Sequence, residues 1–403
     1  MMNRLYGDNR FHRAFVFLFL PPMLFLSLAL VGSVKVEAGA FVFAGETFGV
    51  DVVTHPPNYT GAGGEVTVSV CIDPAATNAV AMETPVKNIV STINAFVPKS
   101  PNLIFGVAND IPVGEFDFES LTLHEFGHCL SLHHPNQGVK TGVSGADTNA
   151  TQSTDGVDNI FNFNSGIDTV PGSNDDIRGD DDNLHYYENL VNNPFVLPAK
   201  ADAANYTRGL TNMAAGDLYP ANAGRAVGPL QVPAVADTEA VMQQGQGSDE
   251  DQRALQSDDV ATLMYGGTGL DETVGGTDDY TIKLVYAGLT TACDIVVESA
   301  ATGFASCGFG GTFLSATHVG ITTGTFRYNP TAVTWYFNPV LACDDIEIDY
   351  AHDAKIAHTA CGQVTTKNGF SVGALGDVKL AGTKVVMENG SSVTGKLVVE
   401  ITP

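Results

Sequence analysis

Two histidines one helical turn apart are the residues best placed to do chemistry. His124 and His128 enclose Glu125 in the stretch Leu123-His-Glu-Phe-Gly-His. Residues four apart lie on the same face of an α-helix, so the two imidazoles can bind one zinc ion. A carboxylate beside the first histidine can hydrogen-bond a zinc-bound water and accept its proton. The spacing predicts hydrolysis by a zinc-activated water, with Glu125 as general base.

The third zinc ligand is expected outside this helix. Catalytic zinc takes three protein ligands and keeps one position open. His133 and His134 follow the helix at once, and both are candidates. His185 is a further candidate, although a histidine in an acidic loop is more often a surface residue. The residues by themselves leave the third ligand open.

The segment resembles the zinc signature of the metzincin metallopeptidases, and of the matrixins in particular. In that signature His-Glu-x-x-His is followed by two residues, a glycine, two more residues and a third histidine. The residues at the matching positions are His124, Glu125, His128 and His134. The resemblance implies a zinc endopeptidase that binds the metal through these three histidines.

One position departs from the family pattern. The family has glycine where this chain has Ser131, and that glycine lets the chain leave the helix in a left-handed turn. We therefore expect about 1 kcal/mol or more of backbone strain at Ser131. A shift of the chain there by one residue would bring His133 to the metal in place of His134.

A methionine beneath the zinc site is a second feature of this family. Met242 and Met264 are the candidates. Met242 is followed by Arg253-Ala-Leu-Gln-Ser-Asp-Asp259 and later by Tyr265-Gly266, which resembles the closing helix of the matrixins. The resemblance, which covers residues 65–134 and 237–270, implies that Met242 forms the methionine turn and that Met264 is a core residue.

The elements that position these residues can be read from periodicity and caps. Residues 65–72 alternate between apolar and other residues, as a strand does, and 103–107 form another strand candidate. Thr84-Pro85 matches a helix start, and Pro98 ends that helix. Asp117 caps the helix that carries the histidines, and a short helix is expected at 257–263.

The composition predicts three parts. An α+β metzincin-like catalytic domain, with a twisted mixed sheet and an active-site helix, is expected over 39–270. Residues 135–237 are rich in Asn, Asp, Gly and Ser and form a long insertion in it. Residues 271–403 show short alternating runs and are expected to form a separate all-β accessory domain of unknown ligand, with a hairpin at Asn389-Gly390.

The insertion contains an acidic run that suggests calcium. Calcium prefers carboxylate and carbonyl oxygens, and the matrixin resemblance adds to this expectation. The candidate ligands are Asp175, Asp176, Asp180, Asp181 and Asp182. A solvated acidic loop is the alternative.

The chain has six cysteines, an even number that is compatible with disulfides. Within the expected β domain, close spacing favours the pairs Cys293–Cys307 and Cys343–Cys361. Cys71 and Cys129 remain, either bridged to each other or as small core residues.

The N-terminus indicates export. Arginines precede an apolar run over 14–31 and small residues follow, which predicts a secretory signal peptide at 1–38. Pro21 and Pro22 argue against an uncleaved anchor, and no other segment is long and apolar enough to span a membrane. The formal net charge is −26, which disfavours nucleic acid as a partner.

Together these patterns predict a secreted zinc-dependent endopeptidase that acts on protein or peptide substrates. The alternative is a non-catalytic surface or adhesive protein, with a vestigial protease core and a β domain that binds.

Overall fold

The computed structural model describes residues 38–43, 52–98, 110–134, 169, 184–187, 241–243, 245–271, 273 and 275–402. The chain divides into two units, Met1–Val34 and Lys35–Pro403, and every described residue belongs to the second. The expected signal peptide, apart from Ala38, and the strand expected at 103–107 lie outside the described residues. So does the expected insertion, apart from Thr169 and residues 184–187.

The largest element is a six-stranded, mostly parallel sheet. Its strands, in their order across the sheet, are β2 (Val53–His55), β10 (His318–Tyr328), β8 (Ile295–Ser299), β3 (Gly64–Ile72) and β7 (Tyr280–Leu289), and β9 (Ala305–Phe313) pairs antiparallel with β10. The expected alternation in β3 is confirmed, because Val66, Val68 and Val70 are buried while Glu65 and Thr67 are exposed. One face of β3 therefore faces a core.

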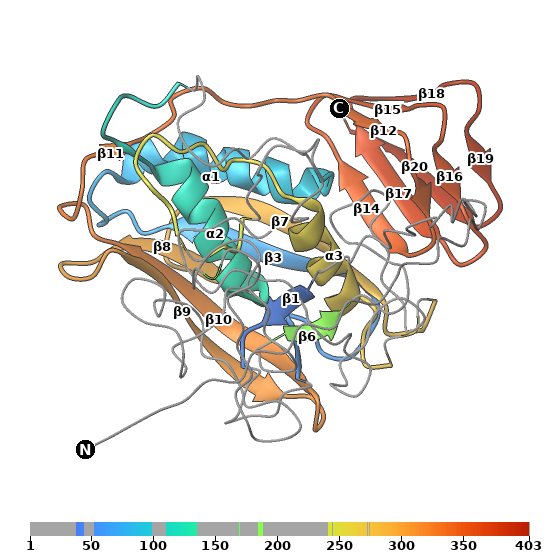
Figure 1. Ribbon diagram of the computed structural model, residues 1–403, viewed down its shortest axis with the longest axis horizontal. Coiled ribbons are helices and arrows are strands. Elements are labelled where there is room, and N and C mark those ends of the chain that lie inside the picture. The colour runs from blue at the N-terminus through green and yellow to red at the C-terminus, as the bar shows by residue number, and fades with distance from the viewer. Residues whose placement is uncertain are drawn as a thin grey trace, which may run out of the picture. The chain divides into compact units, whose positions relative to one another are not determined.

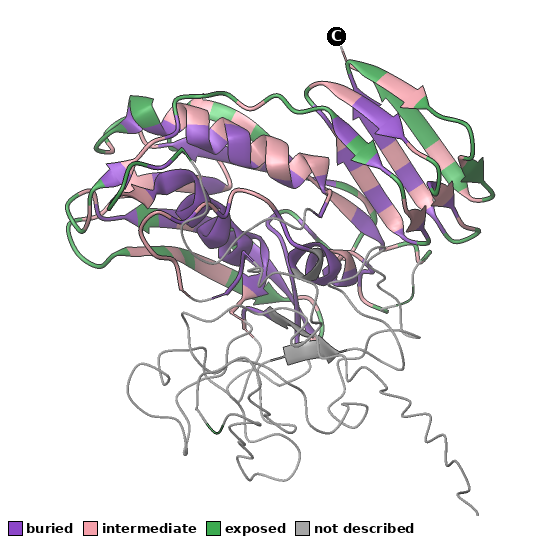
Figure 2. Cartoon of the chain, turned by 45° about the horizontal axis from the view of Figure 1, so that its top comes forward, coloured by how far each residue is buried: buried purple, intermediate pink, exposed green. Residues whose placement is uncertain are grey.

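Helices cover that face. They are α1 (Ala79–Ala95), α2 (Phe118–Leu130) and α3 (Ser257–Gly266). Helix α1 contacts β3 and β7, and α2 contacts β9, β10 and α1 (Figure 1). The buried residues of helices and sheet meet between the two layers (Figure 2). The caps expected for α2 at Asp117 and the helix expected near 257–263 are both confirmed.

The expected start of α1 is wrong. The helix begins at Ala79, after Asn78 as N-cap, and Pro85 lies inside it. Asn78 has a φ of 63°, a left-handed conformation that Asn adopts more easily than most residues. The chain can therefore turn into the helix before Thr84, and Pro85 is accommodated at the loss of one backbone donor. Pro98 follows the C-cap Phe96, as expected.

Two small sheets flank the helices. In the first, β1 (Ala38–Phe41) lies between β5 (Leu132–His133) and β6 (Leu184–Tyr187). In the second, β4 (Phe116–Asp117), directly before α2, pairs with β11 (Trp335–Tyr336). The first of these sheets guides the chain as it leaves α2, and the second guides it into α2.

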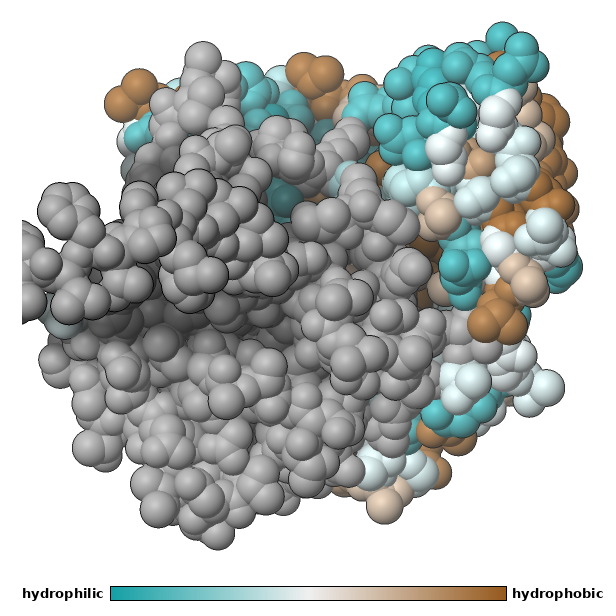
Figure 3. Space-filling view, turned by 45° about the vertical axis from the view of Figure 1, so that its right-hand side comes forward, coloured by the Kyte–Doolittle hydropathy of each residue, from teal (hydrophilic) through white to brown (hydrophobic). Residues whose placement is uncertain are grey.

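The C-terminal strands form a parallel β-helix of three coils, each of roughly 20 residues. Its three sheets are β12 (Ile346–Ile348), β15 (Gln363–Thr366) and β18 (Lys384–Met387); β13 (Ala351–His352), β16 (Ser371–Val372) and β19 (Ser392–Val393); and β14 (Lys355–Thr359), β17 (Asp377–Gly382) and β20 (Lys396–Ile401). Apolar side chains fill its interior, among them Ile348, Val364, Phe370, Val378 and Leu380. On its last coil Val399 and Ile401 are exposed, and hydrophobic atoms lie among hydrophilic ones on this side of the molecule (Figure 3).

Two expectations for this region are wrong. Residues 271–403 do not form one separate β domain, because β7 and β8 both pair with β3 and belong to the central sheet. Asn389-Gly390 does not form a hairpin, because the strands on either side of it belong to different sheets of the β-helix. Periodicity indicates that a segment is a strand, but it does not identify the partner strand.

Candidate metal centre

Helix α2 is fixed at its N-terminus by a buried ion pair. Asp117 accepts a hydrogen bond from the backbone N–H of Ser120 at 2.9 Å. The guanidinium of Arg253 donates to both oxygens of the same carboxylate, at 2.7 and 2.9 Å. Paired hydrogen bonds of this kind are strong and directional. They hold the start of α2 against the segment that leads into α3.

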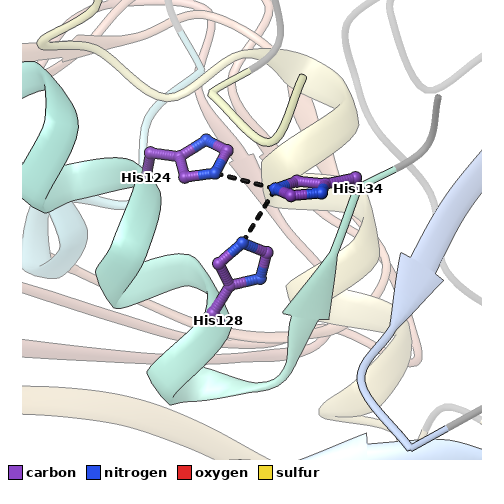
Figure 4. Close-up of side chains that lie close together, drawn as sticks. All are labelled: His124, His128 and His134. Carbon is purple, nitrogen blue, oxygen red and sulfur yellow. Dashed lines mark hydrogen bonds between the residues drawn. The ribbon is translucent and has the colours of Figure 1, made fainter. Parts of the chain in front are cut away.

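Three imidazoles converge at the other end of α2. His124 and His128 project from the helix and meet His134, which follows β5 (Figure 4). The Nε2 atom of His134 lies 3.0 Å from Nε2 of His124 and 2.9 Å from Nε2 of His128. The structure thus brings together the three histidines expected as metal ligands.

The hydrogen bonds of the first two histidines define their protonation. Nδ1 of His124 lies 2.6 Å from the carbonyl oxygen of Val241, and Nδ1 of His128 lies 2.8 Å from that of Leu132. A carbonyl only accepts, so each Nδ1 carries the proton and each neutral ring has a bare Nε2. His134 can donate one Nε2–H to only one of them. A cation satisfies all three nitrogens at once.

These donors fit a zinc ion. Zinc binds histidine nitrogen at about 2.0–2.1 Å, which places tetrahedral ligands about 3.3 Å apart. An Nδ1–H bound to a carbonyl is typical of metal-binding histidine. Burial lowers the pKa of His124 to about 4 and lowers the pKa values of His128 and His134 well below the usual value. The imidazoles are therefore neutral at neutral pH, the form that binds metal.

Of the two other candidate ligands, His133 lies outside this group. His133 pairs with Ala40 in the β1–β5 sheet, and its Nδ1 accepts the backbone N–H of His134 at 2.9 Å. It supports the chain beside the site, while His134 completes the group. His185 lies in β6, and its side chain is outside the described residues.

The backbone conformation at Ser131 is one from which strain is expected. Ser131 has a φ of 150° and is 2% exposed. Its N–H donates to the carbonyl of Gly127 at 3.0 Å, and its own carbonyl accepts the N–H of Val42 at 2.8 Å. A positive φ is costly for a residue with a side chain. The chain nevertheless leaves the helix here, and three residues later it presents His134.

Met242 lies against α2, as the family resemblance implies. A Cβ atom on Gly127 would lie only 2.1 Å from Sδ of Met242, so the thioether sits against the backbone between the two helical ligands. The backbone N–H groups of Val241 and Met242 donate to the buried carboxylate of Asp259, at 2.9 and 3.2 Å. The turn is thereby tied to α3. Met264 is half-buried within α3 and packs against the core.

Glu125 is held from the sheet side. Its Oε2 accepts the backbone N–H of Cys307 in β9 at 2.6 Å, and the residue is 6% exposed. Burial raises the pKa of Glu125 to about 7, against the lowering effect of the Cys307 amide. A carboxyl with such a pKa can both accept and donate a proton near neutral pH.

The disulfides correct the expected pairing. They join Cys71 to Cys293, Cys129 to Cys307 and Cys343 to Cys361. Only the last of these was expected; the pair Cys293–Cys307 and a bridge from Cys71 to Cys129 are wrong. In the fold, β3 lies beside the start of β8, and α2 lies beside β9. Cysteines that are 222 and 178 positions apart in the sequence therefore come together. The bond from Cys129 anchors the metal-site helix to the strand that holds Glu125.

Several supporting residues escaped the sequence reasoning. The role of Arg253 as partner of the helix cap was not predicted, nor was that of Asp259 as acceptor beneath the methionine turn. Both residues lie in the segment that resembles the matrixin closing helix. That resemblance could have drawn attention to them, although it does not indicate their partners. No sequence pattern indicated that the Cys307 amide would bind Glu125.

Comparisons of the chain with models of protein families, with curated proteins and with solved structures find no match. Within the part of the chain that the structure describes, no helix is long and apolar enough to cross a membrane. The interpretation of this three-histidine centre therefore depends on its own geometry.

Proposed function

We propose that this protein is a zinc-dependent endopeptidase. The observation that carries the proposal is the meeting of three Nε2 atoms, from two buried histidines and the half-buried His134. Two of these atoms lack a proton because the Nδ1–H groups of His124 and His128 bind backbone carbonyls. His124, His128 and His134 would hold the metal and leave a fourth position open. When bound in such a site, zinc acidifies a water molecule and polarises the carbonyl of the scissile bond.

Glu125 would move the proton. Its Oε2 is engaged by the amide of Cys307, which leaves Oε1 to accept the proton of the attacking water and to return it to the leaving amine. The hydrogen bond from the Cys307 N–H fixes the orientation of the Glu125 carboxylate. The disulfide between Cys129 and Cys307 holds α2 and β9 together. The carboxylate of Glu125 would thereby be held in position before a substrate binds.

We further propose that the protein works outside the cytoplasm. All six cysteines are paired in disulfides, which persist in oxidising compartments. This observation supports the export expected from the N-terminus.

Hydrolysis of a mixed peptide library by the full chain, followed by mass spectrometry with and without chelator, tests the proposal. Glu125→Gln keeps an amide oxygen for the Cys307 N–H, so the fold and the zinc content should remain. The kcat/KM for cleaved peptides should fall about 10²- to 10⁴-fold. The matched control is Glu115→Gln, at a half-buried position before α2, which should cleave as the wild type does.

Near wild-type cleavage by Glu125→Gln would refute the role of Glu125 as general base. Absence of cleavage by zinc-loaded wild-type protein would refute the activity itself and would favour the alternative of a non-catalytic surface or adhesive protein with a vestigial core.

A further inference from the structure

We propose that Asp271, Asp278 and Asp279 form a binding site for a calcium ion, independent of the three-histidine centre. The three residues lie in the loop that leads from α3 to β7. One carboxylate oxygen from each of them lies within 4.8 Å of the others. The loop is distinct from the acidic run at 174–183 in which calcium was expected.

Backbone amides fix all three carboxylates. The N–H of Thr273 donates to Oδ1 of Asp271 at 2.9 Å, and the N–H of Leu270 donates to Oδ2 of Asp278 at 2.8 Å. The N–H of Gly275 donates to Oδ2 of Asp279. One oxygen of each carboxylate is thus anchored, and the other remains available.

Two of the available oxygens approach the same glycine. A Cβ atom on Gly276 would lie 2.8 Å from Oδ1 of Asp278 and 3.1 Å from Oδ2 of Asp271. These are the oxygens that the backbone amides do not engage. A side chain at Gly276 would therefore intrude where the two carboxylates converge.

The third available oxygen is buried without a partner. Asp279 is 2% exposed, and its Oδ1 has no hydrogen-bond partner. A buried polar atom without a partner is destabilising, and a buried charge without one is more so. Among the described residues, no lysine or arginine forms an ion pair with any of the three carboxylates. Burial, and then repulsion from Asp271 and Asp278, raise the pKa of Asp279 to about 6, against the lowering effects of the Gly275 amide and of the more distant Lys355.

The donor set favours calcium over smaller or softer cations. All three ligands are oxygens, which hard cations prefer, and calcium binds oxygen at about 2.3–2.6 Å. Oxygens bound to one calcium ion can therefore lie up to about 4.8 Å apart, and the ligand oxygens of this group all lie within that distance of one another. Magnesium usually keeps several waters and is bound through only one or two carboxylates.

A cation at this site would link the loop after α3 to the starts of β3 and β7. Asp279 directly precedes β7, and its carbonyl accepts the N–H of Gly64 at the start of β3, at 3.0 Å. The hydroxyl of Tyr59 donates to the carbonyl of Asp278 at 3.3 Å. Binding would therefore stabilise the loop after α3 together with the starts of β3 and β7.

Terbium luminescence on the full chain, after removal of metals by chelator, tests this site. Terbium occupies calcium sites, and Tyr59 is close enough to sensitise it under ultraviolet excitation. We expect emission that calcium displaces, with at least a tenfold loss of terbium affinity in Asp271→Asn and in Asp278→Asn. Asp271 is exposed, so its replacement should not unfold the protein. The control Asp349→Asn, at an exposed position in the β-helix, should bind as the wild type does.

Thermal unfolding supplies a second readout. Calcium alone should raise the Tm of the wild type and of Asp349→Asn, and it should raise the Tm of Asp271→Asn distinctly less. The proposal would be overturned if both aspartate variants bound terbium as tightly as the wild type, or if calcium changed neither emission nor Tm. Neither readout uses hydrolysis, so failure here would leave the proposed peptidase activity untouched.

Discussion

The Nδ1 atom of His124 lies 2.6 Å from the carbonyl oxygen of Val241, although 117 positions separate the two residues. Val241 directly precedes Met242, and Asp259 binds the backbone N–H groups of both. The carboxylate of Asp259 in α3 thus holds the turn at Val241 and Met242, and this turn holds the imidazole of His124. Loss of such outer bonds typically lowers metal affinity about 10- to 100-fold.

The contact between Met242 and α2 predicts the effect of Gly127→Ala. The added methyl group would overlap Sδ of Met242, so the thioether must shift away from its place against α2. We expect zinc affinity to fall about tenfold or more and stability to fall by about 1–3 kcal/mol. Competition with a chromophoric chelator and urea unfolding measure both.

Gly266→Ala is the matched control for this substitution. At Gly266, in α3, an added Cβ would come no closer than 3.4 Å to another residue, an ordinary contact. Equal zinc affinities for the two alanine variants would mean that Met242 does not support the centre.

The conformation of Ser131 predicts that glycine is better there. At a φ of 150°, Ser131→Gly should relieve strain and raise the free energy of unfolding by about 1 kcal/mol, with zinc binding retained. Ser392→Gly, at an exposed strand position, should instead lower it by about 0.5–1 kcal/mol. Chemical denaturation compares the two. Destabilisation by Ser131→Gly would show that the backbone there is not strained.

The positions of His133 and His134 predict unequal effects of their removal. His134→Ala removes one of three ligands and should lower zinc affinity by more than the roughly 100-fold that an outer contact contributes. His133→Ala removes only the acceptor of the His134 N–H and should have a mild effect. Measured metal stoichiometry in the opposite order would exchange the roles of the two histidines.

A pair of buried histidines in the β-helix predicts acid sensitivity. Nε2 of His352 lies 2.9 Å from Nε2 of His358, whose Nδ1 lies 2.9 Å from the carbonyl of Ala95 at the end of α1. Burial lowers the pKa of His352 to about 3 and that of His358 to about 4. Because an unfolded histidine titrates near 6.5, the unfolded chain binds protons between about pH 6.5 and 4 that the folded chain does not.

The free energy of unfolding should therefore fall as pH is lowered through this window. Each of the two histidines contributes at most about 1.4 kcal/mol per pH unit. Urea unfolding of the chelator-treated protein at several pH values measures the slope. His358→Gln should reduce this slope by the contribution of one histidine, at most about 1.4 kcal/mol per pH unit. An unchanged slope would show that His358 does not cause the acid sensitivity.

The helix of the site could be predicted because its determinants are local. Asp117 caps α2 through a residue three positions away, and the spacing of His124 and His128 follows from one helical turn. The position of His134 as third ligand and that of Met242 beneath the helix came from the resemblance, and the geometry agrees with both. The interpretation of that geometry as a peptidase centre remains a prediction.

Features that depend on distant partners could not be predicted. The strand period of β7 does not reveal that β7 pairs with β3, and the positions of Cys71 and Cys293 do not reveal their bond. The β-helix left one signal, since Asn-Gly recurs at residues 368–369 and 389–390. These turns stack, so that a Cβ on Gly390 would lie 2.5 Å from Oδ1 of Asn368. The hairpin propensity of Asn389-Gly390, taken alone, predicted the wrong topology.

X-ray absorption at the zinc edge, on the full chain loaded with one equivalent of zinc, identifies the ligands of the metal. We predict one zinc ion per chain with three histidine nitrogens at about 2.0–2.1 Å, and one histidine fewer in His134→Ala. Failure to retain stoichiometric zinc, or zinc bound without these histidines, would contradict this prediction.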